Sequence, residues 1–362
     1  MRSIHTADAH VADVEPLVPP AELRAEIPLS PAGRDAVLRG SEAIRGVLRG
    51  EDDRIIVITG PCSVHDPAAV RTYAERLARL AADVQDEIVI VMRVYTEKPR
   101  TRFGWKGLIS DPHLDGSRDI NAGLRVAREL MVDIATSGVP VGTEFLDPSV
   151  PGYLSDAVSW GCIGARTVQS QIHRQLASGL PMPIGFKNAT DGEVLDAVDA
   201  VAAATQSHSF PTSTDDGRPG ILTTTGNPDG HVVLRGGSLG PNYGPIDVAK
   251  GRVLLSQAGL PNRLLVDASH GNSGKDHRRQ ELVAENVAWR LHRGETGIAG
   301  VMLESFLVEG NQKLELGRAD QLVYGRSVTD ACIDWTSNVR IIQRFAAAVD
   351  HRRAGRRTAL AG

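Results

Sequence analysis

Eight short apolar runs in this sequence each end in a residue that can bind phosphate, carboxylate or a metal ion. In chain order these residues are Cys62, Arg93, Glu144, Arg166, Lys187, Arg235, His270 and Glu304. A barrel of eight parallel strands holds the carboxyl ends of all its strands on one rim, and barrel enzymes carry out their chemistry there. The pattern therefore predicts one pocket, in which four of these residues are cationic and three are of metal-ligand types.

The strand-end cations indicate an anionic ligand. Each follows directly on an apolar run, where a cation without a partner would be costly, and guanidinium groups match phosphate and carboxylate oxygens in pairs. More cations crowd the segment after the second run, namely Lys98, Arg100, Arg102 and Lys106. Because one phosphate needs fewer cations, we expect two anionic groups, or a carboxylate-phosphate substrate beside a second phosphorylated one. For Arg102 and Lys106, solvated surface charge is the alternative interpretation.

The metal-ligand types form a mixed soft and hard set. Cys62, His270 and Glu304 lie at strand ends, and Asp330 follows later in the segment GRSVTDACIDW. Such a set suits transition metals better than Mg or Ca, which prefer oxygen ligands throughout. No short-spacing metal motif is present, and a single Cys is often a small buried hydrophobe, so the prediction depends on the shared rim. His65 is either a competing ligand or a loop histidine.

Composition limits the class of protein. A length of 362 residues suits one large domain with additions, or two domains, and a net charge of −4 does not favour nucleic-acid binding. Three cysteines without a CxxC pair make a disulfide scaffold unexpected. The first residues lack the apolar core of a secretory signal and no run is long enough to span a membrane. We therefore expect a cytoplasmic protein.

Strand and helix patterns alternate along the chain, which is typical of a parallel sheet. We predict an α/β fold: a (β/α)8 TIM barrel over 51–350, an N-terminal helical extension over 1–50 and a disordered basic tail over 351–362. An insertion over 207–230 contains GILTTTGN, which could form a β-hairpin, and the segment 96–117 is another long loop. The expected helices span 67–83, 118–138, 150–159, 170–179, 190–204, 245–259, 276–294 and 335–349.

The motifs GPCSVHD, RVYTEKPRTRFGWKG, GTEFLDP, WGCIGART, GFKNATDG, LRGG, DASHGNSGK, LVEGNQ and SVTDACIDW occur in this order along nearly the whole chain. Together they resemble the type I synthases of 3-deoxy-D-arabino-heptulosonate 7-phosphate (DAHP). The resemblance implies a barrel transferase that condenses phosphoenolpyruvate with erythrose 4-phosphate and releases phosphate, the first step of the shikimate pathway, which supplies the aromatic amino acids.

The resemblance also implies roles for individual residues. It implies a divalent transition metal (Mn, Fe, Co or Zn) held by Cys62, His270, Glu304 and Asp330. It implies phosphoenolpyruvate contacts from Arg93, Lys98, Arg166, Lys187 and Arg235, with Glu144 nearby. It implies erythrose 4-phosphate contacts from Lys98, Pro99, Arg100 and Thr101. The metal would act as a Lewis acid on the aldehyde oxygen, and Lys98, or a metal-bound water, could protonate the new alkoxide. We therefore expect Lys98, Cys62 and His270 to carry the catalysis.

The sequence departs from the family pattern at four positions. Val168 and Gln169 replace the usual residues after GART, and Phe306 stands where a polar residue is common. Pro181 stands where feedback-regulated members often carry serine in the site for an aromatic amino acid. We therefore expect weak regulation or a different effector. The family also implies a homo-oligomer, a dimer or tetramer, in which the arm and the insertion build the inhibitor site and subunit contacts.

Three other interpretations remain open. The first is a sister activity on the same rim: a KDO 8-phosphate synthase, or an amino-sugar variant of DAHP synthesis in secondary metabolism. The second makes Lys187 a Schiff-base lysine, because desolvation among cations can lower its pKa. The third is a barrel that binds an effector or partner without catalysis, although the complete set Cys62, His270, Glu304 and Asp330 argues against it.

Overall fold

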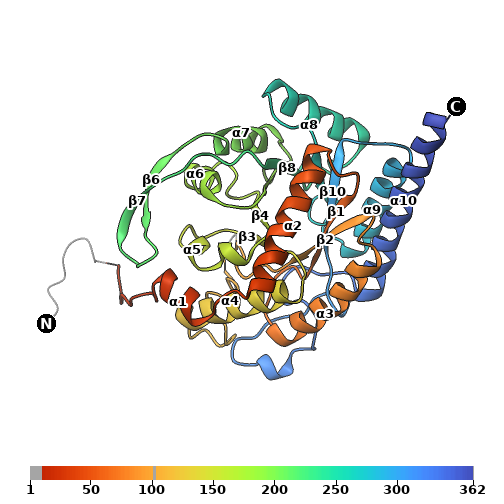
Figure 1. The fold of residues 1–362 in the computed structure, drawn as a ribbon. Coiled ribbons are helices and arrows are strands. Elements are labelled where there is room, and N and C mark those ends of the chain that lie inside the picture. Colours follow the sequence, from red (N-terminus) through yellow and green to blue (C-terminus); the bar gives the residue numbers. More distant parts are fainter. Residues whose placement is uncertain (1–9, 101–102, 362) are drawn as a thin grey trace, which may run out of the picture.

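The computed structural model describes residues 10–100 and 103–361, and side chains as far as residue 355. Eight parallel strands close into a barrel in the order β1-β10-β9-β8-β5-β4-β3-β2, with helices around it (Figure 1). The strands are β1 (Ile55–Gly60), β2 (Ile88–Arg93), β3 (Val141–Glu144), β4 (Trp160–Ile163), β5 (Ile184–Lys187), β8 (Gly230–Leu234), β9 (Leu264–Asp267) and β10 (Ile298–Glu304). Every residue of these strands is buried, which explains their continuous apolar sequences. The predicted α/β barrel is confirmed.

The outer helices connect successive barrel strands, except the last, which follows β10. They are α3 (Pro67–Asp83), α4 (Ile120–Thr136), α5 (Pro151–Leu154), α6 (Gln171–Gly179), α7 (Leu195–Ala204), α8 (Pro245–Gln257), α9 (Gln280–His292) and α10 (Trp335–Ala361). The side chain of Asp66 accepts hydrogen bonds from the amides of Ala68 and Ala69, so it caps α3 as its sequence predicts. The helix expected over 190–204 starts later, because Gly192 adopts a φ of 115°, outside the helical region.

The N-terminal extension forms two helices, α1 (Pro20–Glu26) and α2 (Pro31–Arg49). Helix α2 runs across β1 and β2 (Figure 1). Its Ile44 and Val47 join the apolar cluster inside the barrel, where they meet Ile56 and Val89. The extension therefore buries much of its apolar surface on its own barrel, although we expected it to pack chiefly on a neighbouring subunit.

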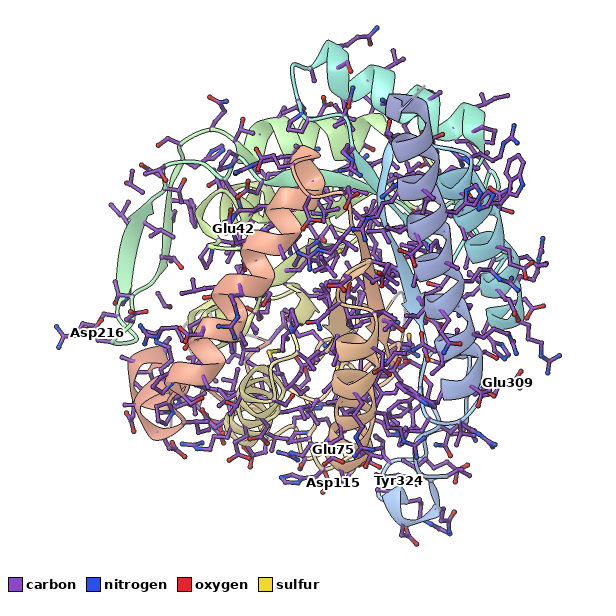
Figure 2. All side chains as sticks on the ribbon, turned by 45° about the vertical axis from the view of Figure 1, so that its right-hand side comes forward. Glu42, Glu75, Asp115, Asp216, Glu309 and Tyr324 are labelled. Carbon is purple, nitrogen blue, oxygen red and sulfur yellow. The ribbon has the colours of Figure 1, made fainter. Side chains whose placement is uncertain are left out.

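The insertion forms the predicted hairpin, from β6 (Ser209–Ser213) and β7 (Pro219–Thr223). It stands away from the barrel (Figure 1), and Figure 2 shows Asp216 at its tip. Asp215 of the same turn accepts a hydrogen bond from the amide of Ala21 and pairs with Arg24 at 2.6 Å. Because an isolated two-stranded hairpin is only marginally stable, these contacts with the extension help to hold it.

Two loops at the carboxyl rim pack on each other. Trp105 and Leu114 of the loop after β2 are buried, and the indole of Trp105 donates to the carbonyl of Asp111. The amide of Gly317, in the loop after β10, donates to the carbonyl of Leu114. Asp115 and Tyr324 accordingly lie at the same end of the molecule (Figure 2).

The C-terminal segment differs from the prediction. We expected disorder over 351–362, but α10 continues to Ala361. The guanidinium of Arg353 pairs with Asp53, its Nε lying 3.0 Å from Oδ2. Because the segment is rich in alanine and arginine, which favour helix, the helix has no reason to end at residue 350. Among the described residues, the helices are too short or too polar to cross a membrane.

Candidate active site

A cavity of about 610 Å³ opens at the carboxyl rim of the barrel. It collects most of the residues predicted from the sequence. Those that line it are Arg93, Lys98, Pro99, Arg100, Glu144, Arg166, Lys187, Arg235, His270, Glu304 and Asp330. Cys62 is fully buried directly beside them, and Thr101 lies outside the described residues. The barrel therefore brings these distant positions to one place.

Three of the four predicted metal ligands form a compact cluster. Ligand atoms of Cys62, Glu304 and Asp330 all lie within 4.8 Å of one another, so this part of the site could hold a metal ion. His270 adjoins them, because its Nε2 lies 3.6 Å from Oε1 of Glu304. His65 does not join the cluster: it packs edge-on against Phe306, and burial lowers its pKa to about 4. The donor set of thiol, carboxylates and imidazole suits a transition metal.

Lys98 reaches into this cluster from the loop after β2. Its ammonium donates to Sγ of Cys62 at 2.7 Å and to Asp330 at 3.1 Å. Burial disfavours the ammonium, but the neighbouring acidic groups, Cys62 first, outweigh burial and raise the pKa of Lys98. Burial, together with Glu304, raises the pKa of the Cys62 thiol to about 12.

Two of the strand-end cations have protein partners, which corrects the expectation that each needs an anionic ligand. Arg93, at the end of β2, pairs with Glu304 at 2.9 Å and stacks 3.6 Å above the ring of Tyr95. Lys187, at the end of β5, pairs with Asp267 at 2.8 Å. Both cations are almost fully buried, and a buried pair of this kind offsets the cost of desolvating each charge.

Arg166 and Arg235 are different, since neither pairs with a carboxylate in the part of the chain that the structure describes. Arg166 is exposed at the rim, and Arg235 is half-buried, with its Nη1 3.3 Å from the carbonyl of Gly236. Burial lowers the pKa of Arg235, and the nearby Arg166 lowers it further. Two adjacent cations without carboxylate partners are the arrangement that an anionic ligand stabilises.

The backbone around these cations is held by buried asparagines. Oδ1 of Asn188 accepts from the amide of Arg235 at 2.7 Å, and Asn242 accepts from the amide of Gly236.

Glu144 lies so close to Gly164 that a side chain at Gly164 would come within 2.0 Å of the carboxylate. The glycine is therefore required if the carboxylate is to line the cavity.

Sequence reasoning missed two buried acids. Asp267 ends β9 and contacts both Lys187 and His270. Burial disfavours its charge, yet His270 and Lys187 hold the pKa of Asp267 well below its usual range. Glu97 accepts from the amides of Leu146 and Asp147, and burial raises its pKa to about 8. The position of Asp267 at the end of the run LLVD was the available signal, and it follows the same rule that selected the other strand-end residues.

Fold and cavity together define an α/β-barrel enzyme whose site combines cations with a group of metal-ligand residues. The chain matches the family described as the DAHP synthetase I family over residues 26–343. It therefore belongs to this family, which confirms the resemblance drawn from its motifs and the interpretation as a DAHP synthase.

Known relatives agree over nearly their full length. The Trp-sensitive phospho-2-dehydro-3-deoxyheptonate aldolase of Enterobacter agglomerans is 50% identical over 347 residues, 96% of this chain and 99% of the relative. The Tyr-sensitive enzyme of Escherichia coli strain K12 is 50% identical over 328 residues, 91% of this chain and 92% of the relative. The solved structure of the Francisella tularensis SCHU S4 aldolase, 45% identical, superposes with a TM-score of 0.92 over 94% of this chain and 99% of that one.

Proposed function

We propose that this chain condenses phosphoenolpyruvate with erythrose 4-phosphate to give DAHP and phosphate, the first reaction of the shikimate pathway. One observation carries the proposal: the cations Arg166 and Arg235, which lack carboxylate partners among the described residues, share a cavity with the cluster of Cys62, Glu304 and Asp330. The relatives bear the name of the corresponding aldolase. Phosphoenolpyruvate is a carboxylate and a phosphate in one small molecule, so it suits adjacent guanidinium groups.

Phosphoenolpyruvate would lie among the strand-end cations. Arg166 and Arg235 supply guanidinium forks, and Lys187 keeps donors free, because its contact with Asp267 uses only one of the three N–H groups. Arg93 and Glu144 border the same space. Holding an anion against these pre-organised donors restricts its position, which is a major part of catalysis between two bound substrates.

Erythrose 4-phosphate would lie against the loop after β2. Lys98, Pro99 and Arg100 line the cavity there, and Thr101 would complete this set. The backbone of the loop is held by the amide of Lys98, which donates to the carbonyl of Lys106 at 2.8 Å. This segment favours the four-carbon sugar phosphate over the longer substrate of a KDO 8-phosphate synthase.

The residues Cys62, His270, Glu304 and Asp330 would hold a divalent transition metal: Mn, Fe, Co or Zn. When bound there, such an ion would supply Lewis-acid polarisation of the aldehyde carbonyl. The cluster fits this role, since it joins one sulfur to carboxylates and an imidazole.

One side chain of the site can supply the proton that the new alkoxide needs. C3 of phosphoenolpyruvate forms a bond to the aldehyde carbon, and the aldehyde oxygen becomes an alkoxide. The ammonium of Lys98 is the acid best placed to protonate it, since it projects into the cavity beside Asp330. Bond formation at C3 leaves C2 electron-deficient, so water adds there and releases one proton to solvent. The hydroxyl of the resulting hemiketal phosphate then loses its proton as the C2 keto group forms and the bond between C2 and the phosphate oxygen breaks to release phosphate.

The geometry disfavours the Schiff-base mechanism. Nζ of Lys187 lies 2.8 Å from the carboxylate of Asp267, so the nitrogen is engaged with an acid, whereas a Schiff-base lysine must present a free amine to a carbonyl carbon. Borohydride added with phosphoenolpyruvate and erythrose 4-phosphate together should therefore trap no adduct on Lys187, and mass spectrometry of the digested protein would detect one if it formed.

We also propose a homo-oligomeric assembly and weak feedback control. The hairpin β6–β7 exposes Ile221 to solvent, which supports a role in subunit contacts.

Pro181 borders a second cavity of about 750 Å³ between the extension, α5 and the hairpin. Its side chain offers no hydrogen-bond donor, so it cannot contact a bound amino acid as serine would.

The direct test is phosphate release from phosphoenolpyruvate with erythrose 4-phosphate, before and after treatment with a chelator. We expect release only with the metal present, and restoration by Mn, Fe, Co or Zn. Arabinose 5-phosphate, the five-carbon substrate of the sister enzyme, is the matched control and should support little release. Equal release with both sugars, or release that survives complete metal removal, would contradict the proposal.

A further inference from the structure

Asp267 has no exposed surface, and its carboxylate is shared by two groups of the site. Oδ2 lies 2.8 Å from Nζ of Lys187 and 2.9 Å from Nδ1 of His270. Oδ1 accepts from the amide and the hydroxyl of Ser269, at 3.0 and 2.6 Å. All the hydrogen bonds of this acid are thus made within the site.

These contacts determine which ring nitrogen of His270 carries its proton. Oδ2 of an ionised Asp267 can only accept a hydrogen bond. The hydroxyl of Ser269, 2.7 Å from Nδ1, already donates its proton to Oδ1, so it too can only accept from the ring. In a neutral imidazole Nδ1 therefore bears the hydrogen, and Nε2 keeps its lone pair on the side of Glu304, 3.6 Å away.

The backbone supports the same arrangement at an energetic cost. His270 adopts a φ of 55°, a left-handed conformation that residues other than glycine rarely take. The amide of Lys275 donates to the carbonyl of His270 at 2.8 Å and closes the turn. Strained conformations of this kind persist where the surrounding structure holds a side chain in a functional direction.

We propose that Asp267 is the positioning residue for His270: it holds the imidazole in the tautomer that offers Nε2 to a metal ion, and Lys187 neutralises its charge. The inference rests on the proposed role of His270 as a ligand. A carboxylate behind a ligating histidine sets the tautomer and orientation of the ring, and its loss lowers metal affinity about 10- to 100-fold.

The test is a Co²⁺ titration of the metal-free protein, followed by the absorbance of the thiolate–cobalt charge-transfer band. For Asp267→Asn we expect Co²⁺ affinity about 10- to 100-fold below that of the wild type. Asp229→Asn is the matched control, because Asp229 also pairs with two cations, Arg45 and Arg49, outside the cavity.

The wild-type protein provides a second measurement that needs no folded variant. Nitrogen-15 NMR of the metal-free protein, with His270→Ala to assign the signals, should show the proton of His270 on Nδ1. The opposite tautomer, or Co²⁺ affinity of Asp267→Asn within threefold of the wild type, would overturn the proposal. Failure of the metal site itself is distinguishable, because the wild type would then show no charge-transfer band.

Discussion

Lys98 and Cys62 form the closest contact between the substrate loop and the metal-ligand cluster, with Nζ of Lys98 2.7 Å from Sγ of Cys62. The same ammonium lies 3.1 Å from Asp330. One cation therefore compensates the acidic groups of the cluster while it lines the cavity. This relationship makes Lys98 and Cys62 the first residues to test.

Replacement of Cys62 by alanine should abolish product formation without unfolding the protein. The substitution removes the sulfur ligand, and because loss of a group behind a ligand already costs up to about 100-fold, we expect at least that loss of activity. Cys162→Ala is the control, since Cys162 packs among apolar residues inside the barrel. Steady-state rates and circular dichroism would check this. A fully active Cys62→Ala protein would refute the metal assignment.

Lys98→Met should lower kcat by about 10²- to 10⁴-fold, the usual contribution of a positioned general acid. Lys106→Met is the matched control, because Lys106 belongs to the same loop, is exposed and does not line the cavity. Its kcat should stay close to that of the wild type. If the two variants lose activity equally, Lys98 acts only through the charge of the loop.

Arg235→Gln should raise the KM for phosphoenolpyruvate by about 10- to 100-fold, because a hydrogen bond to a charged group contributes about 1.5–3 kcal/mol. Arg166→Gln should act in the same direction. Arg278→Gln is the control, since Arg278 pairs with Glu309 and does not line the cavity. The KM for erythrose 4-phosphate, measured in the same series, should change much less. An unchanged KM for phosphoenolpyruvate in both variants would rule out these guanidinium groups as its ligands.

The contribution of His231 to the stability of the fold should fall as the pH drops from 6.5 towards 4. Burial lowers the pKa of His231 to about 4, below the ordinary value of 6.5. The unfolded chain therefore binds a proton more readily than the native protein, and the stabilisation present above pH 6.5 is lost as the pH falls. The difference corresponds to about 3 kcal/mol. In the native state Nε2 of His231 accepts from the indole of Trp160 at 3.0 Å, and protonation removes that acceptor.

Urea unfolding between pH 4.5 and 7.5, followed by tryptophan fluorescence, measures this dependence. His231→Asn should show a smaller loss of unfolding free energy over the same range, because asparagine does not titrate there. His65 has a similar pKa of about 4 and adds to the loss, whereas Glu97, whose pKa burial raises to about 8, changes the stability in the opposite direction over this range. An identical pH dependence in the wild type and the variant would show that His231 is not responsible.

Pro181 predicts that aromatic amino acids inhibit this enzyme only weakly. Relatives of equal identity carry the names Trp-sensitive and Tyr-sensitive, so overall similarity does not identify an effector. Titration of Phe, Tyr and Trp in the phosphate-release assay would decide, with Pro181→Ser as the comparison. We expect stronger inhibition by at least one of the three after this substitution. Strong inhibition of the wild type at micromolar concentration would disprove the prediction.

The amino-acid sequence was sufficient to predict the barrel and most residues of its rim. Each buried parallel strand is a largely apolar run, and a charged residue at or just after its last position marks the carboxyl end. That rule is sufficient to place Arg93, Lys187, Arg235 and Glu304 at the rim. The same rule places Asp267 at the rim, but its pairing with Lys187 is known only from the structure. The hairpin insertion is also predictable, because its length exceeds that of a simple connection.

Only the tertiary structure decided which charges pair. Arg93 ends β2 and Glu304 ends β10. They meet because only β1 separates these two strands in the closed barrel. Lys187 meets Asp267 across β8, which separates β5 from β9. Among the described strand-end cations, these pairings leave Arg166 and Arg235 without a carboxylate partner. Strand order and side-chain direction are properties of the closed barrel, and no local pattern of residues contains them.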